Sequence, residues 1–314
     1  DAAGNVSPSS APLSITIDNI APTAGIPDLL GVTDSGTSNT DNITNSTSPQ
    51  FTVPNAVTGD VVTVSAVNGG TTKTCTYTVT ANVTSCAMSG VTAGTWSVTS
   101  TITDEAGNVS SVSAPLSMTV DTTAPSAPGA PDMAASSDTG ASSTDNLTAD
   151  NTPAMSASGG STGDTVTISA TNGNSTVSCT YVVGSATTCD LPVLSDGTWS
   201  VSATLTDPAG NVSVVGQPLS IVIDATAPST PTGLDLLASS DTGASSTDNY
   251  TADTTPTLSA AGGANGDTMT ISATNGSTTV SCTYVVGQAT SCTLPVLADG
   301  VWNVSATLTD PLGN

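Results

Sequence analysis

The sequence is almost devoid of basic residues. Lys73 is the only lysine, arginine and histidine are missing, and the 314-residue chain has a formal net charge of −24 at pH 7. Nucleic-acid binding needs basic side chains that displace the counterions of the phosphates, and an anionic membrane surface would repel this chain. No apolar run approaches membrane-spanning length. We therefore expect no nucleic-acid partner and no direct membrane insertion.

Residues that carry out catalysis or stack on sugars are also scarce. Without histidine, and with one lysine, aspartate pairs are the remaining general acids and bases. Aromatic residues make up only 3% of the chain, which leaves little for the exposed platform of a carbohydrate-binding module. We predict that the chain is not an enzyme, and we keep a carbohydrate-binding module as a second alternative.

What the sequence has instead is a long internal repeat. The motif Asp-x-x-Gly-Asn begins at Asp1 and returns at Asp104, Asp207 and Asp310, which gives a period of 103 residues. A unit of this size can bury its own hydrophobic core, so each period predicts one domain in an excerpt of a longer protein. The predicted division is residues 1–18 as the F to G turn and strand G of a preceding repeat, 19–121 as repeat 1, 122–224 as repeat 2, and 225–314 as repeat 3 without its last strand.

Alternation of apolar and polar residues predicts β-strands. Around Trp199 the apolar residues Val201, Ala203 and Leu205 share one face, and the same register returns in the other repeats with Ser100 as one polar exception. No segment shows helical periodicity. About seven short strands per repeat predict an all-β fold of tandem immunoglobulin-like sandwiches in a linear array. In repeat 2 we expect strands near 130–136, 153–158, 164–171, 198–206 and 212–223, and a hairpin across 176–190.

The six cysteines fall as one pair per repeat. Such even pairs predict intradomain disulfides and an oxidising compartment. A hairpin turning near Gly184 would bring the two sulfurs of repeat 2 to facing positions. No Cys-x-x-Cys spacing is present, which argues against zinc binding and redox catalysis. The predicted pairs are Cys75 with Cys86, Cys179 with Cys189, and Cys282 with Cys292.

The order of several short motifs resembles a known family over essentially the whole chain. The strings Asp121-Thr122-Thr123-Ala124-Pro125, Ser137-Asp138-Thr139-Gly140, Thr144-Asp145-Asn146-Leu147-Thr148 and Thr152-Pro153, followed by Asp-x-x-Gly-Asn, resemble the bacterial Ig-like repeats of giant secreted adhesins and biofilm-associated proteins. The resemblance implies a non-catalytic extender that is exported to the cell surface, with domain junctions stiffened by calcium. The linker is also similar to that of cadherins, in which an Asp-bearing segment ending in Ala-Pro follows the last strand.

The aspartates give a separate reason to expect calcium. All 25 acidic residues except Glu105 are aspartate, a short oxygen ligand suited to hard cations. In an immunoglobulin-like sandwich the F to G turn lies at the entry pole, while the A to B connection and the end of strand G lie at the exit pole. Carboxylates that converge there without a basic partner would repel one another unless a cation lay between them. The expected ligands are Asp18 and Asp104 at the first junction, Asp34, Asp41, Asp121 and Asp207 at the second, and Asp138, Asp145, Asp224 and Asp310 at the third.

The same residues have a simpler interpretation, because aspartate forms turns whether or not a metal is present. We interpret Asp60, Asp164 and Asp267 as turn residues of this kind. Near the first strand of each repeat, Asp28, Asp132 and Asp235 fit either role.

The leading functional hypothesis is a stalk segment of a large secreted adhesin, with the neighbouring repeats of the chain as its partners. The alternative is a self-assembling fibre, sheath or surface layer in which other copies of the chain pack side by side. Threonine-rich faces suit lateral packing, whereas the negative charge opposes it unless calcium also bridges chains.

Overall fold

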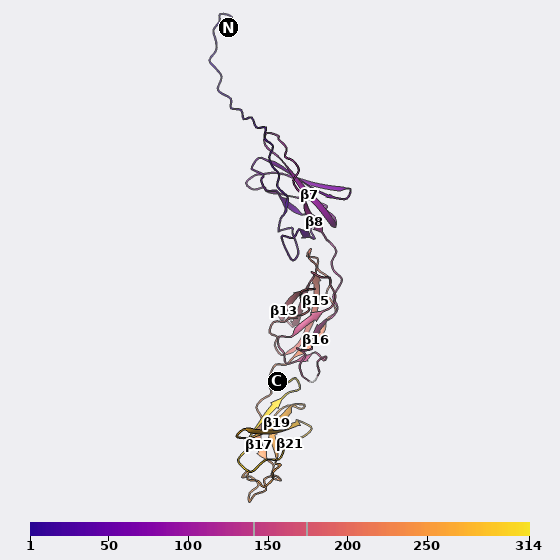
Figure 1. Ribbon diagram of the computed structural model, residues 1–314, viewed down its shortest axis with the longest axis vertical. Helices are drawn as coiled ribbons and strands as arrows, with labels where there is room; N and C mark the ends of the chain where they lie inside the picture. Colours follow the sequence, from indigo (N-terminus) through magenta and orange to yellow (C-terminus); the bar gives the residue numbers. More distant parts are fainter. Residues whose placement is uncertain (141, 174) are drawn as a thin grey trace. The chain divides into compact units, whose positions relative to one another are not determined.

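The computed structural model describes residues 1–140, 142–173 and 175–314. These residues form β-strands and no helix, so the predicted all-β class is confirmed (Figure 1). Consequently, they include no helix long and apolar enough to cross a membrane. The chain forms two compact units, one of residues 1–125 with 206–212, and the other of residues 126–205 with 213–314.

The first unit contains the sandwich of repeat 1, which packs two sheets around one core. The smaller sheet has the order β1 (Asp28–Leu29), β3 (Gln50–Thr52), β6 (Ser85–Ala87). The larger has the order β2 (Ile43–Thr44), β8 (Leu116–Val120), β7 (Gly94–Thr103), β4 (Val61–Asn68), β5 (Thr71–Thr78). Trp96 and Phe51, one from each sheet, are fully buried between them.

The second unit contains the sandwiches of repeats 2 and 3. In repeat 2 the smaller sheet has the order β9 (Pro131–Met133), β11 (Ala154–Ala157), β14 (Cys189–Asp190). The larger sheet has the order β10 (Leu147–Thr148), β16 (Leu219–Ile223), β15 (Gly197–Thr206), β12 (Thr165–Asn172), β13 (Ser175–Val182). In repeat 3 the sheets are β17 (Thr232–Leu236), β18 (Thr257–Ala261), β21 (Ser291–Thr293), and β20 (Thr278–Val285), β19 (Thr268–Asn275), β22 (Asn303–Thr309).

The alternation that predicted strand β15 also sets its buried face. Trp199, Val201, Ala203 and Leu205 are each at most 3% exposed, as the sequence pattern predicts. The polar end of the buried Trp199 side chain is satisfied within the fold, because its indole donates a hydrogen bond to the Ser195 carbonyl (2.9 Å). The Phe51, Trp96 and Trp199 rings thus lie in the cores of their sandwiches, whereas Tyr250 is 78% exposed.

The predicted hairpin across 176–190 is wrong. Strand β13 pairs with β12 in the larger sheet, whereas β14 pairs with β11 in the smaller one. The hairpin lies one connection earlier, where Asn172 of β12 pairs with Ser175 of β13 and Gly173 has a left-handed φ of +57°, which glycine adopts without strain. After β13 the chain crosses from one sheet to the other. Strand β16 is also shorter than the predicted 212–223.

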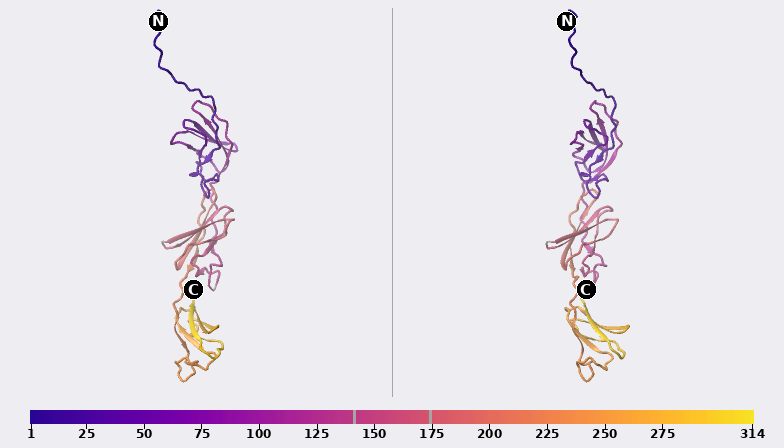
Figure 2. Two further views of the ribbon diagram at one scale, coloured as in Figure 1. Left: turned by 60° about the vertical axis from the view of Figure 1, so that its left-hand side comes forward. Right: turned by 90° about the vertical axis from the view of Figure 1, so that its left-hand side faces the viewer.

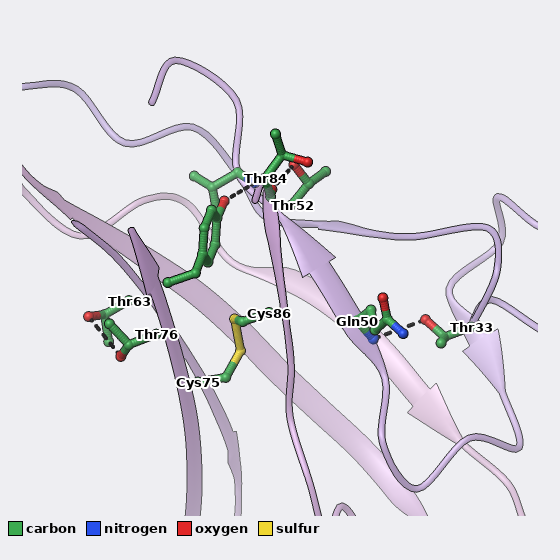
Figure 3. Close-up of a disulfide and its surroundings, with 10 residues drawn as sticks. Thr33, Gln50, Thr52, Thr63, Cys75, Thr76, Thr84 and Cys86 are labelled. Atoms are coloured by element: carbon green, nitrogen blue, oxygen red, sulfur yellow. Dashed lines mark hydrogen bonds between the residues drawn. A yellow bond between two sulfur atoms is a disulfide. The ribbon is translucent and has the colours of Figure 1, made fainter. Parts of the chain in front are cut away.

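The disulfides consequently join the two sheets of each sandwich. Cys75 of β5 is bonded to Cys86 of β6, and Figure 3 shows this bond spanning the gap between their strands. The Cα atoms of each bonded pair are 5.8 to 5.9 Å apart. In the larger sheet, the Thr63 hydroxyl of β4 and the Thr76 hydroxyl of β5 form a cross-strand hydrogen bond (Figure 3). The other two disulfides are Cys179–Cys189 and Cys282–Cys292.

Candidate junction sites

The loop after β1 holds a buried aspartate. Asp34 is 2% exposed, and its Oδ2 accepts a hydrogen bond from the Asn42 amide (3.2 Å), while its Oδ1 has no hydrogen-bond partner. Burial raises the pKa of Asp34; the Asn42 amide acts in the opposite direction, and the nearby Asp41 carboxylate adds to the rise. The equivalent residues Asp138 and Asp241 are 5% and 4% exposed and also leave Oδ1 without a partner.

The second predicted acid of this loop caps the strand that follows. Asp41 Oδ1 accepts a hydrogen bond from the Ile43 amide (3.0 Å) at the start of β2, and Asp145 does the same for Leu147 at the start of β10 (3.2 Å). Asn42, which lies between Asp41 and Ile43 in the sequence, has a left-handed φ of 62°, which asparagine tolerates better than most residues. The loop therefore presents one buried and one exposed carboxylate.

The Asp-x-x-Gly-Asn motif forms a closed turn. Asp207 Oδ1 accepts a hydrogen bond from the Asn211 amide (2.9 Å), and its Oδ2 accepts one from the Asn211 side chain (2.8 Å). The turns that begin at Asp104 and Asp310 repeat this arrangement. The side-chain hydrogen bond from Asn108 lowers the pKa of Asp104, because it stabilises the charged form. These aspartates thus have a structural role that needs no metal.

The asparagine of the same motif fixes the linker, a role that the sequence analysis missed. The Asn211 side chain donates a hydrogen bond to the backbone carbonyl of Asp121 (2.9 Å). Asp121 itself caps the linker, since its Oδ1 accepts a hydrogen bond from the Thr123 amide (2.9 Å). The signal was present in the repeated motif, but spacing alone does not reveal a partner 90 residues away. The equivalent contacts are Asn108 to the Asp18 carbonyl (3.2 Å) and Asn314 to the Asp224 carbonyl (2.6 Å).

Within the first unit, the loop that carries Asp34 contacts the turn of residues 206–212. The Ser35 hydroxyl donates a hydrogen bond to the Ala209 carbonyl (2.7 Å). Gly36 has a φ of +104°, and a Cβ atom there would lie 1.9 Å from the Pro208 carbonyl oxygen. In the second unit Gly140 approaches the backbone of Pro311 in the same way. Loop and turn are therefore in direct backbone contact.

The carboxylates do not converge as fully as the loops do. Among residues 1–140, 142–173 and 175–314, no three acidic, histidine or cysteine side chains form a group that could hold a metal. The expected four-aspartate cluster is therefore missing from the described part of the chain. What the structure brings together is Asp34 with the nearby Asp41, on a loop whose Ser35 contacts Ala209 of the turn that begins at Asp207.

The interpretation of Asp60, Asp164 and Asp267 as turn residues is confirmed. Asp60 Oδ2 accepts a hydrogen bond from the Val57 amide (2.9 Å), three residues earlier. Asp164 and Asp267 accept the equivalent bonds from Ser161 and Ala264, both at 2.8 Å. All three residues are buried and close the turn that leads into the long hairpin of their sandwich.

The repeats also match a known protein family. The model of the bacterial Ig-like domain matches residues 21–122, 124–225 and 227–314. The chain belongs to the bacterial Ig-like domain family. The resemblance drawn from the sequence motifs is thereby confirmed, and three tandem copies of a bacterial Ig-like domain cover most of the chain.

Solved structures similar to these bacterial Ig-like repeats include other tandem β-sandwich proteins. They include the FN1–FN3 domains of chicken CNTN1 (10% identity, 93% of this chain and 94% of that one, TM-score 0.38). Two others come from bacteria: a 1.5-MDa ice-binding adhesin (19% identity, 95% of each chain, TM-score 0.33) and a Ca²⁺-stabilised adhesin of an Antarctic bacterium that binds ice (20% identity, 93% of this chain and 73% of that one, TM-score 0.34). Among curated proteins, none matches the chain.

One junction contact distinguishes the bacterial Ig-like repeats from one another. Asp196, just before β15, accepts hydrogen bonds from the Ala225 amide (2.9 Å) and from the Thr226 hydroxyl. The Thr226 hydroxyl is the main cause of the lowered pKa of Asp196, and the Ala225 amide adds to it. Repeat 1 has Ala93 at the equivalent position. The linker after repeat 2 therefore has a side-chain anchor that the linker after repeat 1 lacks.

Proposed function

We propose that this chain is a non-catalytic extender segment of a large extracellular bacterial adhesin, and that calcium bound at the repeat junctions stiffens it. The observation that carries the calcium proposal is the buried Oδ1 atom that lacks a hydrogen-bond partner in Asp34, Asp138 and Asp241. A buried carboxylate oxygen without a donor is costly, and a cation would offset that cost. Its recurrence in all three repeats indicates a common structural purpose.

The residues present fit calcium better than magnesium. Asp34 with Asp41, and Asp138 with Asp145, supply carboxylate oxygens in loops that also offer backbone carbonyls and hydroxyls. Calcium accepts six to eight oxygens in irregular geometry, including carbonyls and water, whereas magnesium demands a near-ideal octahedron. Because no group of three acidic side chains occurs in the described residues, backbone and water oxygens must complete the shell.

The remaining predicted ligands have a different part in the proposal. Asp207 and Asp310 already accept hydrogen bonds from the asparagine of their own motif. Asp121 and Asp224 cap the linker, and Asp18 and Asp104 form the equivalent linker cap and turn. In this proposal these residues hold the linker and the turn in place beside the loops that carry Asp34 and Asp138. A bound cation neutralises part of the repulsion among them.

Two observations support an extracellular, non-catalytic role. Each sandwich carries a disulfide between its sheets, and disulfides persist in oxidising compartments. The chain has no histidine and a single lysine, and its acids recur from repeat to repeat in turns and caps. Domains of this kind are suited to act as spacers, because each has its own core and a short linker to the next.

Calcium titration of the 314-residue chain tests the proposal. We expect calcium to raise the thermal midpoint, and to increase the maximum dimension in small-angle scattering, relative to chelator. The triple variant Asp34→Asn, Asp138→Asn, Asp241→Asn should lose both effects. Asp190→Asn removes one charge at an exposed position and should retain them. If the parent chain gives the same midpoint and dimension in calcium and in chelator, calcium stiffening is wrong.

A further inference from the structure

The long hairpin of repeat 2 leaves one strand at the edge of the larger sheet. Strand β13 pairs with β12 along its whole length, from Thr165 opposite Val182 to Asn172 opposite Ser175. It is the last strand in the order of its sheet, and among the described residues its other side, over 175–181, forms no backbone hydrogen bond. Figure 2 shows this hairpin, in rose, at the margin of the repeat 2 sandwich in both views. Strand β13 therefore presents free amides and carbonyls along one side.

This edge strand lies in a part of the chain without charge. Residues 165–189 of repeat 2 and 268–298 of repeat 3 contain no acidic or basic residue, although the whole chain carries a net charge of −24. Strands β13 and β20 read Ser-Thr-Val-Ser-Cys-Thr-Tyr-Val and Thr-Thr-Val-Ser-Cys-Thr-Tyr-Val. Edges that are uncharged and rich in β-branched residues pair readily with further strands, and natural proteins often block them with a charged side chain. Strands β13 and β20 lack that block.

Repeat 1 carries such a blocking residue at the matching position. Lys73, the single basic residue of the chain, lies in the edge strand β5 and shares the more buried side of that strand with Cys75 and Tyr77. Val177 and Val280 occupy this position in repeats 2 and 3, and both pack against the hydrophobic core. A strand added to β5 would desolvate the ammonium group, whereas a strand added to β13 would cover a valine. The repeats therefore differ in how well this edge accepts another strand.

We propose that β13 pairs antiparallel with β13 of a second copy of the chain, so that the two larger sheets become continuous. The contact is symmetric, because the same strand contributes from both copies. A register centred on Cys179 keeps the inward-facing side chains of both copies on one side of the joined sheet. Val177 then lies opposite the partner's Tyr181, an aliphatic–aromatic pair that stabilises antiparallel sheets. Main-chain hydrogen bonds supply the affinity, as in other complexes formed by strand addition.

A second copy is the partner that the charges favour. Two chains of net charge −24 repel each other over most of their surfaces, but an approach through β13 brings no carboxylate into the paired strands. A basic partner would instead be attracted to the acidic loops of the junctions. Asp190 of the adjoining strand β14 is exposed, so salt screens its repulsion and should promote pairing. The same contact through β20 would join such dimers into larger assemblies.

Cross-linking of the 314-residue chain tests the register. In the proposed pairing Thr176 of one copy lies opposite Val182 of the other. A mixture of Thr176→Cys and Val182→Cys chains should therefore give a cross-linked dimer with a short bismaleimide at about 0.5 M NaCl, where repulsion is screened. Each variant alone should give at least tenfold less, because its two thiols lie about 20 Å apart along the paired strands. The described residues contain no free cysteine that would compete.

Exchanging the residue that distinguishes the repeats gives a second measurement, which needs no cysteine variant. Val177→Lys with Val280→Lys transfers the arrangement of Lys73 into repeats 2 and 3, and should weaken association at least tenfold in analytical ultracentrifugation. Strand β5 shows that the sandwich accommodates a lysine at this position. Lys73→Val should strengthen association, because it frees a third edge.

Three results would overturn the proposal. The first is a chain that stays monomeric at every salt concentration. The second is a cross-linking yield that is equal in the mixture and in the separate cysteine variants. The third is association that is unchanged by Val177→Lys with Val280→Lys, since it would then come from another surface. Cross-linking in calcium and in chelator should be the same, because no carboxylate lies in the paired strands.

Discussion

The side chain of Asn211 donates one hydrogen bond to the Asp121 carbonyl (2.9 Å) and another to the Asp207 carboxylate (2.8 Å). It thereby joins the linker to a turn that lies far along the chain. Asn108 and Asn314 make the same pair of contacts. A motif that reads as a local turn is thus also the point at which each linker is held.

Replacing Asn211 with alanine should loosen this junction. The Asp207 carboxylate and the Asp121 carbonyl each lose a donor, and we expect a loss of about 1 to 2 kcal/mol in the local opening free energy. Hydrogen exchange of the amides at 207–213 should rise accordingly. Asn5→Ala is the matched control, because Asn5 makes the same bonds to Asp1 in an exposed segment. Unchanged exchange at 207–213 would mean that the linker bond contributes nothing.

Gly36→Ala should separate the loop from the turn it contacts. A side chain at φ +104° is strained, and its Cβ would lie 1.9 Å from the Pro208 carbonyl oxygen. We expect the Ser35 to Ala209 hydrogen bond to break and the exchange of both segments to increase. Gly69→Ala has a left-handed φ of +55° with open space around it, and should leave the junction intact. If Gly36→Ala and Gly69→Ala give the same amide exchange rates in both segments, the contact between loop and turn is dispensable.

Removing the disulfide of repeat 2 should destabilise that sandwich alone. Cys179 and Cys189 are 10 residues apart in sequence, and closing a loop of this size is worth about 3 kcal/mol by the loop-entropy model. In the double variant Cys179→Ala, Cys189→Ala, exchange should rise in β12 and β13. The equivalent strands β4, β5, β19 and β20 of the same molecule serve as internal controls. A uniform rise through all three repeats would show that the sandwiches do not unfold independently.

The Asp196 anchor should make the linker after repeat 2 dependent on pH. Its hydrogen bonds lower the pKa of Asp196 below the usual 3.8, so the contact stabilises the fold above that pH and is lost as pH falls through the lowered value. Asp196→Asn should raise the mobility of Ala225 at pH 7, measured by amide relaxation, and the difference from the parent should vanish in acid. A difference that persists at all pH values would contradict a charged anchor.

Repeat 1 offers the reciprocal experiment. Ala93→Asp places a carboxylate at the position equivalent to Asp196, and Thr123 stands where repeat 2 has Thr226. We expect the amide of Thr122 to become less mobile at pH 7 and to return to the parental value in acid. Ala93→Asn should have a smaller effect, because it accepts hydrogen bonds without the charge.

Much of the fold could be predicted because it depends on local periodicity. The two-residue alternation around Trp199 specifies a strand with one buried face wherever it lies in the chain, and the structure confirms that face. The period of 103 residues and the motif order likewise identified the family. The polar Ser100 on the buried face was visible in the sequence, but the reason for it was not. Its hydroxyl donates a hydrogen bond to the Gly25 carbonyl (2.7 Å), which lies 75 residues earlier and which a local pattern does not reveal.

The sequence by itself determined the all-β class, the repeats and the cysteine pairs, because these follow from spacing and residue chemistry. Only the tertiary structure decided which sheet each strand joins. It therefore placed Cys189 in the sheet opposite Cys179, turned Asn211 toward Asp121, and left Oδ1 of Asp34 buried without a donor. The reason is physical: pairing partners and burial depend on residues distant in the chain, which local patterns do not specify.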